Sequence, residues 1–256
     1  MAVKIKPEPS RASYSKFWLL YFIFMIGLVG ACTAYLICIP LYLLGYWIPG
    51  CQRLADRMLR RGVFTLMSVQ PWLQADIDIS LTSKQDPHTS GRLLVSNHRS
   101  HLDAFLLLSR VPGIRIMAKS SLFSIPFLGL IMKLSQQIPI QRGKMDAFFA
   151  AMETVRKRLR AGETVHIFPE MTRCAPGFKG TLNFSSAPFS AAIQENVVVI
   201  PIAFRSTDAA WPKGTFGLSF RRPVSAVALE PILPGQFTTA DALRSEAKRR
   251  IDEALQ

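Results

Sequence analysis

Residues 95–103 of this chain read Val-Ser-Asn-His-Arg-Ser-His-Leu-Asp, and they join a predicted buried strand to a predicted helix. The strand is the apolar run at 92–96, and the helix begins at Leu102, where further apolar residues follow. His98 is therefore expected at the exit of the strand, and Asp103 in or near the first helical turn. A histidine that titrates and a carboxylate that orients it are the minimum parts of a general base. We interpret His98 and Asp103 as a candidate catalytic pair.

Beyond about residue 73, strand-like and helical segments alternate along the chain. The clearest helical patterns lie at 144–160, which ends before Gly162, and at 240–255, where Thr238 or Thr239 supplies the N-cap. This alternation predicts an α/β fold with a mixed, mostly parallel sheet flanked by helices. Strands are expected at 73–80, 92–96, 114–118, 137–141, 164–168 and 197–204.

Charged side chains stand at the ends of three of these predicted strands. His98 follows the strand at 92–96, Arg142 follows the strand that ends at residue 141, and Glu170 and Arg173 follow the strand that ends at residue 168. The carboxyl ends of parallel strands lie at one edge of a sheet, and ligands bind at that edge. These side chains are therefore expected to face a common crevice.

The N-terminal region has the composition of a membrane segment. Residues 17–39 carry no charged side chain, and a helix of that length extends about 34 Å, against a hydrocarbon thickness of about 30 Å. A second apolar run at 41–48 follows Pro40, and basic residues flank both ends of the whole region. A helical hairpin that dips into one leaflet accounts for both basic flanks, and a single span is the alternative. We expect membrane-docking helices in residues 1–62 and an α/β domain in residues 63–256.

The composition narrows the class of partner. A formal net charge of +14 points to anionic partners, of which membrane lipids and phosphorylated small substrates fit best. Nucleic acid is not expected, because the chain has no helix-turn-helix pattern, zinc-finger spacing or aromatic-basic RNA-binding motif. The four cysteines form no C-x-x-C pair, so a reducing compartment is the simpler interpretation.

Several motifs together resemble the glycerolipid acyltransferase family, which includes the bacterial lysophosphatidate acyltransferases. That family is marked by an Asn-His motif with a later aspartate, a strand that ends in Arg-Gly, a Phe-Pro-Glu-Gly-Thr-Arg segment and a Val-Ile-Pro strand. Here they occur in that order, the first in a variant spacing, and Met171 replaces the glycine of the third. A further segment resembles the family's basic loop. The matching segments are 97–103, 118–129, 142–143, 168–173 and 199–201.

The resemblance implies a glycerol-3-phosphate acyltransferase-like fold and an O-acyltransferase activity. The expected donor is acyl-CoA or acyl-carrier protein, the acceptor is 1-acylglycerol 3-phosphate and the product is phosphatidate. Transfer is expected to be direct, with His98 as general base, Asp103 as its orienting group, and no cofactor or metal. The resemblance also implies attachment to the inner membrane, with the catalytic domain on the cytoplasmic side.

Substrate recognition is expected to depend on the cations. Arg142 and Arg173 are suited to grip a phosphate through two parallel hydrogen bonds, and Lys119 adds a point charge. By resemblance, Glu170 belongs to the acceptor site, where it bonds a glycerol hydroxyl or fixes an arginine. Ser100 is expected to stabilise its turn by hydrogen bonding and not to act as a nucleophile. The expected substrate-binding residues are Lys119, Arg142, Gly143, Glu170, Thr172 and Arg173, with Asn97 and Ser100 as supporting residues.

Three alternatives stay open at the level of sequence. Within the family, the acceptor is another lysolipid, such as a lyso-aminolipid, and the long side chain of Met171 bears on that choice. A metal-dependent hydrolase would use His98, His101 and Asp103, although no further histidine or cysteine motif completes a tetrahedral set. A non-catalytic membrane lipid-binding protein would lack His98 or Asp103, and both are present.

Overall fold

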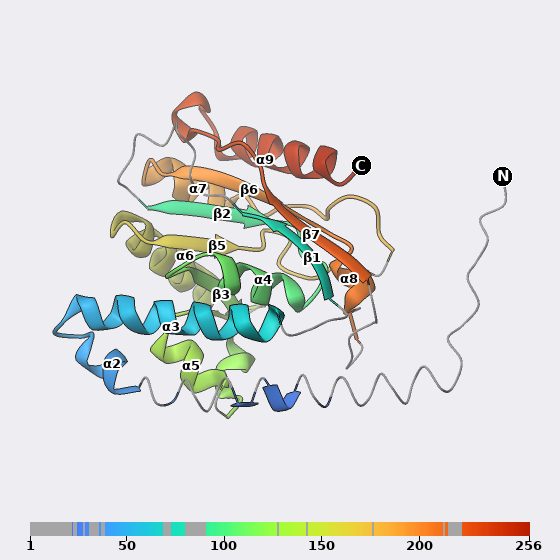
Figure 1. The fold of residues 1–256 in the computed structure, drawn as a ribbon. Coiled ribbons are helices and arrows are strands. Elements are labelled where there is room, and N and C mark those ends of the chain that lie inside the picture. The colour runs from blue at the N-terminus through green and yellow to red at the C-terminus, as the bar shows by residue number, and fades with distance from the viewer. Residues whose placement is uncertain are drawn as a thin grey trace, which may run out of the picture.

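The structure is a computed structural model, and Figure 1 shows one twisted sheet with helices packed on both of its faces. The sheet has seven strands in the order β1-β7-β6-β2-β5-β3-β4, and every pairing is parallel except that of β6 with β7. This arrangement confirms the predicted mixed, mostly parallel sheet. The structure describes residues 22, 25–27, 29, 30, 36, 39–68, 73–79, 91–126, 128–141, 143–175, 177–211, 213, 214 and 222–256.

All six predicted strands are present, β2 with the predicted bounds and the others with ends that differ by at most two residues. A seventh strand, β7, was not predicted. The strands are β1 (Leu73–Asp78), β2 (Arg92–Ser96), β3 (Arg115–Lys119), β4 (Ile138–Ile140), β5 (Thr164–Ile167), β6 (Val198–Arg205) and β7 (Arg222–Ala228).

Strand β2 lies in the middle of the sheet and is buried on both faces. Leu94 packs into an apolar cluster with helices α3 and α4, whereas Leu93 and Val95 pack into a second cluster with α6, α7 and α9. Successive residues of a strand point to opposite faces, so a continuous apolar run is what a doubly covered strand requires. The helices are α2 (Ile39–Leu44), α3 (Pro49–Ser68), α4 (Leu102–Arg110), α5 (Leu128–Leu134), α6 (Met145–Arg160), α7 (Ala187–Gln194), α8 (Thr207–Ala210) and α9 (Ala240–Ala254), with short 3-10 turns η1 (Ser120–Ser124) and η2 (Pro234–Gln236).

The two predicted amphipathic helices are confirmed. Helix α6 buries Met152, Val155 and Leu159 on one face, as the periodicity of the sequence indicates. Helix α9 begins after Thr239, whose side chain accepts a hydrogen bond from the backbone N–H of Ala242 at 3.2 Å.

The predicted N-terminal membrane segment lies mostly outside the described residues. Within the part of the chain that is described, no helix is both long and apolar enough to cross a membrane. The expected domain boundary at residue 62 falls inside α3, and Val63, Leu66 and Met67 of this helix pack into the core with α4 and the sheet. The hairpin, the single span and the boundary itself stay predictions.

A buried ion pair fastens α3 to the sheet. Arg115 on β3 donates to the two carboxylate oxygens of Asp56 at 3.3 and 3.1 Å, and its Nε donates to Glu163 at 2.7 Å. The Tyr42 hydroxyl on α2 donates to Asp56 at 3.2 Å. Burial alone would lower the pKa of Arg115, but the carboxylates of Asp56 and Glu163 raise it. The helices that precede the sheet are thus held by charge as well as by apolar contact.

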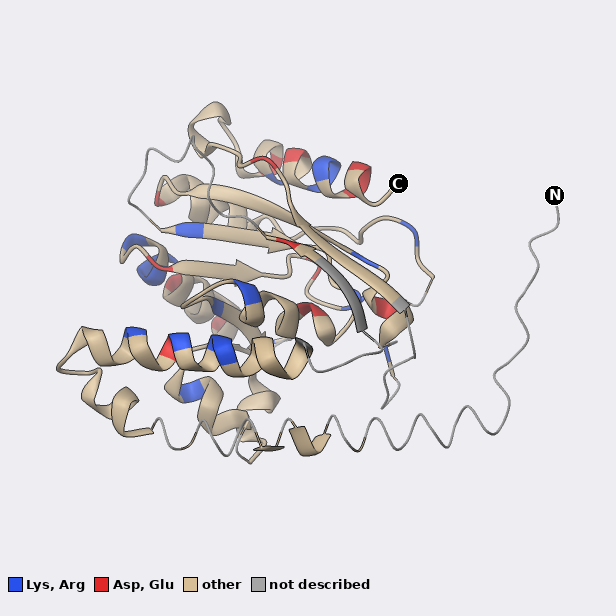
Figure 2. Cartoon of the chain, in the orientation of Figure 1, with Lys and Arg blue, Asp and Glu red and all other residues tan. Residues whose placement is uncertain are grey.

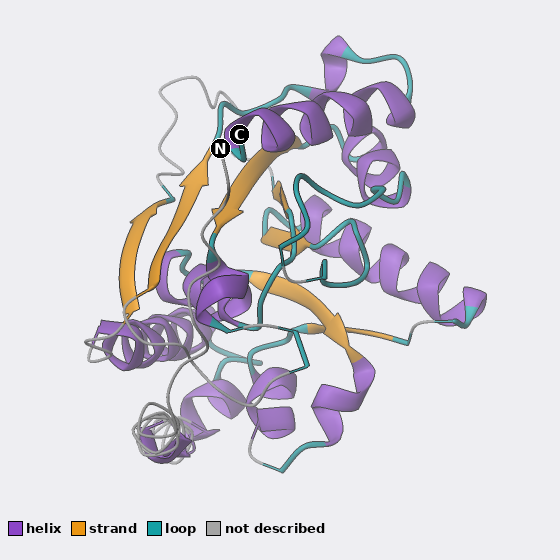
Figure 3. Ribbon diagram, turned by 90° about the vertical axis from the view of Figure 1, so that its right-hand side faces the viewer, coloured by secondary structure: helices purple, strands orange, loops and turns teal. Residues whose placement is uncertain are grey.

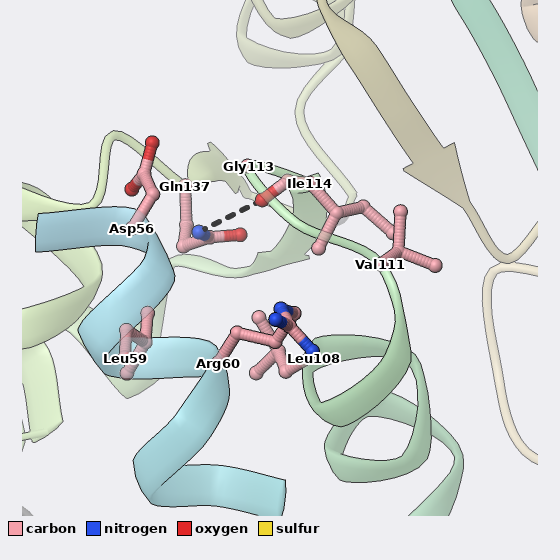
Figure 4. Close-up of a pocket in the computed structure, with 8 residues that line it drawn as sticks. All are labelled: Asp56, Leu59, Arg60, Leu108, Val111, Gly113, Ile114 and Gln137. Carbon is pink, nitrogen blue, oxygen red and sulfur yellow. Dashed lines mark hydrogen bonds between the residues drawn. The ribbon is translucent and has the colours of Figure 1, made fainter. Parts of the chain in front are cut away.

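A small cavity lies beside this ion pair, where α3 meets α4 and the sheet (Figure 4). The Gln137 side chain donates from Nε2 to the carbonyl oxygen of Ile114 at 3.3 Å at this junction. None of the residues predicted for the functional site lines the cavity, so it belongs to the packing of α3. The lining residues are Asp56, Leu59, Arg60, Leu108, Val111, Gly113, Ile114 and Gln137.

Candidate active site

His98 and Asp103 meet where β2 ends and α4 begins. The Nδ1 atom of His98 lies 2.9 Å from Oδ2 of Asp103, which is fully buried in the first turn of the helix. The same oxygen accepts the backbone N–H groups of Arg99 at 2.8 Å and Ser100 at 2.9 Å. Because a carboxylate only accepts hydrogen bonds, the Nδ1 atom carries the imidazole hydrogen and Nε2 is left with its lone pair. The pair therefore has the tautomer that a general base needs.

Aromatic rings support the imidazole from behind. The Phe168 ring stacks on the His98 ring with centroids 3.8 Å apart, and the His166 ring meets Phe168 edge-on at 4.4 Å. His166 is fully buried, and its Nε2 lies 2.9 Å from the Ser96 hydroxyl. Burial, with a smaller contribution from the nearby His98, lowers the pKa of His166 to about 3, so this ring is neutral.

The backbone of His98 is held by the segment that follows β5. The buried Glu170 carboxylate accepts the His98 N–H at 2.9 Å, the Cys174 thiol at 2.9 Å and the Leu182 N–H at 3.1 Å. In return, the Cys174 N–H donates to the His98 carbonyl oxygen at 2.9 Å. Burial and the bond to Glu170 raise the pKa of Cys174 to about 12, which keeps it a thiol donor. Glu170 therefore uses its two oxygens to position the histidine.

The supporting residues predicted from sequence have structural partners. Asn97 exchanges two hydrogen bonds with the backbone of Phe204, at 2.9 and 2.8 Å, and so continues the pairing of β2 with β6 beyond the strand. The Ser100 hydroxyl donates to the carbonyl oxygen of Trp211 at 2.8 Å and accepts the N–H of Leu102 at 3.2 Å. With its hydrogen committed to a carbonyl, this hydroxyl stabilises the turn.

Arg99 anchors the segment between β5 and α7. Its two terminal nitrogens donate to the carbonyl oxygens of Phe178 at 2.9 Å and Gly180 at 3.1 Å. Sequence reasoning assigned no role to Arg99, Phe168 or Cys174. Their partners lie some 70 to 80 residues away in the chain or on another strand. In the sequence, only their position inside or next to the motifs that carry His98 and Glu170 indicates that these residues belong to the site.

Of the cations predicted to bind substrate, Lys119 and Arg173 lie within the described residues. Desolvation and, after it, the positive charge of Arg173 lower the pKa of His101 to about 4, so Arg173 interacts electrostatically with His101. Lys119 is exposed at the end of β3, and Gly143 is exposed beyond β4 with φ of 80°. Thr172 is half-buried between Met171 and Arg173. Arg142, predicted to grip phosphate, lies outside the described residues.

Met171 occupies the position of the motif glycine with φ of 56°. A residue with a Cβ atom costs about 1–2 kcal/mol in this left-handed region, which glycine enters freely. The left-handed backbone at this position explains why the motif carries a glycine. In this chain Met171 occupies the position with a strained backbone.

Metal ligands are a separate question. Across the described ranges, no group of three or more histidine, cysteine, aspartate or glutamate residues is placed to hold a metal ion. The ring of His101 instead faces that of Trp211, with centroids 5.3 Å apart.

Comparison with known proteins gives consistent matches. A model of the acyltransferase family matches residues 79–205. A chloroplastic 1-acyl-sn-glycerol-3-phosphate acyltransferase of Arabidopsis thaliana is 30% identical over 195 residues, which are 74% of this chain and 51% of that protein. The enzyme of the same name from Saccharomyces cerevisiae is 27% identical over 80% of this chain and 68% of its own length. The chain spans about half the length of the first plant relatives that it matches.

A solved structure matches the fold over nearly the whole chain. The crystal structure of a 1-acyl-sn-glycerophosphate acyltransferase from Thermotoga maritima superposes with a TM-score of 0.76, covering 95% of this chain and 96% of that one. The sequence identity of the pair is 21%, so this likeness concerns the fold.

Proposed function

The chain belongs to the acyltransferase family, and from that premise we propose that it transfers a fatty acyl group from acyl-CoA or acyl-carrier protein to 1-acylglycerol 3-phosphate, forming phosphatidate. The observation that carries the proposal is the His98–Asp103 contact of 2.9 Å at the exit of the central strand. The ring is stacked on Phe168, and Glu170 holds its backbone, so the base is preorganised.

In the proposed reaction the acceptor hydroxyl attacks the thioester carbonyl carbon while Nε2 of His98 takes its proton. Asp103 stabilises the imidazolium that forms. When the tetrahedral intermediate collapses, the carbon–sulfur bond breaks and the thiolate receives the proton from His98. The products are an ester and a free thiol, and no acyl-enzyme is formed.

We assign recognition of the acceptor phosphate to Arg173, Arg142 and Lys119. Guanidinium groups bind phosphate with two parallel hydrogen bonds, and a lysine adds charge. The electrostatic interaction of Arg173 with His101, three residues after His98 in the chain, supports this role. Lys119 is the last residue of β3, at the carboxyl ends of the parallel strands, which face the reader in Figure 3, and Arg142 comes shortly after β4 in the sequence.

We also propose that the chain binds the cytoplasmic surface of a membrane through its N-terminal helices. Helices α2 and α3 and the turn between them expose large apolar side chains, and Figure 2 shows basic residues along α3. Apolar groups that enter the interface and cations that meet anionic headgroups together give stable attachment. The exposed apolar residues are Leu43, Leu44, Tyr46, Trp47, Ile48, Leu54, Met58 and Phe64.

Membrane binding is tested by sedimenting the full chain with vesicles of anionic or zwitterionic phospholipid. We expect binding to both, tighter to the anionic vesicles, with a difference that shrinks as salt screens the charges. Absence of the protein from both pellets would contradict the attachment.

The acceptor is tested with purified full-length protein and a panel of lysolipids, measuring thiol release with acyl-CoA and with acyl-carrier protein. We expect the highest kcat/KM for 1-acylglycerol 3-phosphate. Faster transfer to a lyso-aminolipid or to a lysophospholipid with a larger headgroup would reassign the acceptor. Thiol release from neither donor with any acceptor would remove the proposal.

A further inference from the structure

Met171 combines an unfavourable backbone conformation with a position at the centre of the site. Its φ is 56°, and its N–H donates to the carbonyl oxygen of Phe168 at 3.0 Å, which closes a tight turn. Phe168 begins this turn and stacks on His98, and Glu170 within it holds the His98 backbone. A non-glycine residue persists in such a conformation only when its surroundings hold it there, and residues of this kind gather at functional sites.

The Met171 side chain points to an apolar environment. It is half-buried and packs against the cluster between the sheet and helices α6, α7 and α9, to which Phe148 on α6 also packs. Methionine is flexible and fills irregular apolar space, so it adapts to a bound hydrocarbon better than a branched side chain does.

The first turns of α6 carry this apolar surface outward to solvent. Met145 is 65% exposed and Phe149 is 62% exposed, and the Phe149 ring meets the ring of Phe148 edge-on at 6.2 Å. Further along the helix, the side chains outside the core are charged or polar, as at Glu153 and Arg160. Apolar exposure on α6 is therefore confined to the end that follows β4, at the carboxyl edge of the sheet.

We propose that Met171 is a specificity-determining residue. Its side chain limits the length of the fatty acyl chain that is held between the turn from Phe168 to Met171 and the start of α6. The proposal rests on the proposed acyl transfer and adds to it a residue that selects the hydrocarbon. The acyl chain belongs either to the thioester donor or to the lysolipid acceptor, and both have the same chemistry at this surface.

The test compares Met171→Gly with the native chain. One arm varies the donor between lauroyl and stearoyl thioesters with a fixed acceptor, and the other varies the acceptor chain with a fixed donor. Removing the side chain opens apolar space, so we expect the stearoyl-to-lauroyl ratio of kcat/KM to rise about tenfold in one arm. The arm that responds identifies which chain lies against Met171.

Two further variants keep the result interpretable. Met171→Ala keeps a Cβ atom at the same backbone angle and removes the rest of the side chain, and it should shift the ratio in the same direction. Asn196→Gly places glycine at another left-handed position, φ 47°, exposed after α7, and should leave both ratios unchanged. Unchanged ratios in both arms for both Met171 variants would overturn the inference, whereas absence of transfer by the native chain would overturn the proposed function instead.

Discussion

At the scale of single residues, Glu170 differs most from its expected role. The resemblance places it in the acceptor site, but its oxygens accept the N–H of His98, the thiol of Cys174 and the N–H of Leu182. Hydrogen bonds to a buried ionised group are among the stronger ones in proteins. We therefore treat Glu170 as a positioning residue that joins the segment after β5 to the catalytic strand end.

Glu170→Gln tests this assignment. The amide presents an NH₂ group to donors that need an acceptor, so we expect the free energy of unfolding to fall by about 2–4 kcal/mol. kcat should fall while KM for the lysolipid changes little, because His98 moves and the acceptor contacts stay. Urea denaturation and steady-state kinetics measure the two effects. A large rise in the lysolipid KM with unchanged stability would return Glu170 to the acceptor site.

The contact between His98 and Asp103 was predictable from sequence, whereas the supports that Glu170 and Arg99 provide were not. His98 and Asp103 are five residues apart, so a strand end and the first turn of a helix bring them together with no help from the rest of the chain. Glu170 bonds to His98 across 72 residues of sequence, and Arg99 bonds to Phe178 across 79, and local spacing carries no signal for such contacts.

At the scale of elements, the attachment of α3 to the sheet depends on Arg115 and Asp56. Breaking a buried ion pair by removing one partner is destabilising by about 3–5 kcal/mol, because the other charge is left uncompensated. Arg115 keeps its bond to Glu163 in Asp56→Ala, so we expect this variant to lose about 3 kcal/mol, the lower end of that range, in urea denaturation. The double variant Asp56→Leu, Arg115→Met removes both charges, so its free energy of unfolding should fall less than that of Asp56→Ala. Equal stability of Asp56→Ala and the native chain would show that α3 is held by apolar packing.

The helices and strands differ in how readily the sequence predicts them. The apolar runs of β2, β5 and β6 are buried in the sheet, so their composition is their signal. Strand β7 has small residues along its length and Pro223 near its start, before the stretch from Ser225 to Ala228 that pairs with β6, so its composition gives little strand signal. Helix α3 lies in the region expected to flank the membrane segment with basic residues, and its core positions Val63 and Leu66 follow those arginines without a clear signal of their own.

At the scale of the whole molecule, buried histidines make stability depend on pH. The pKa of His166 is about 3 in the fold, against 6.5 for an ordinary histidine, so between these values the unfolded chain binds a proton that the folded chain does not. The stability that the folded state gains by keeping His166 neutral is complete above about pH 6.5 and is lost as the pH falls toward 3.

We expect the free energy of unfolding to fall with a slope of up to about 1.4 kcal/mol per pH unit from His166. His166→Gln keeps a polar group opposite Ser96 and should reduce that slope. Urea denaturation at a series of pH values measures it. An unchanged slope in the variant would mean that groups other than His166 cause the loss of stability at low pH.

The central claim is that His98 takes the acceptor proton, and the most direct measurement is single-turnover thiol release by His98→Ala beside His101→Ala. General-base assistance is worth roughly 100- to 10,000-fold, so the account predicts a loss of that size for His98→Ala. His101 is kept neutral by its pKa of about 4, and its ring packs against the Trp211 ring. The rate of thiol release should therefore fall less than about tenfold in His101→Ala. Equal rates for His98→Ala and the native chain, in a variant that keeps its fold, would contradict the account.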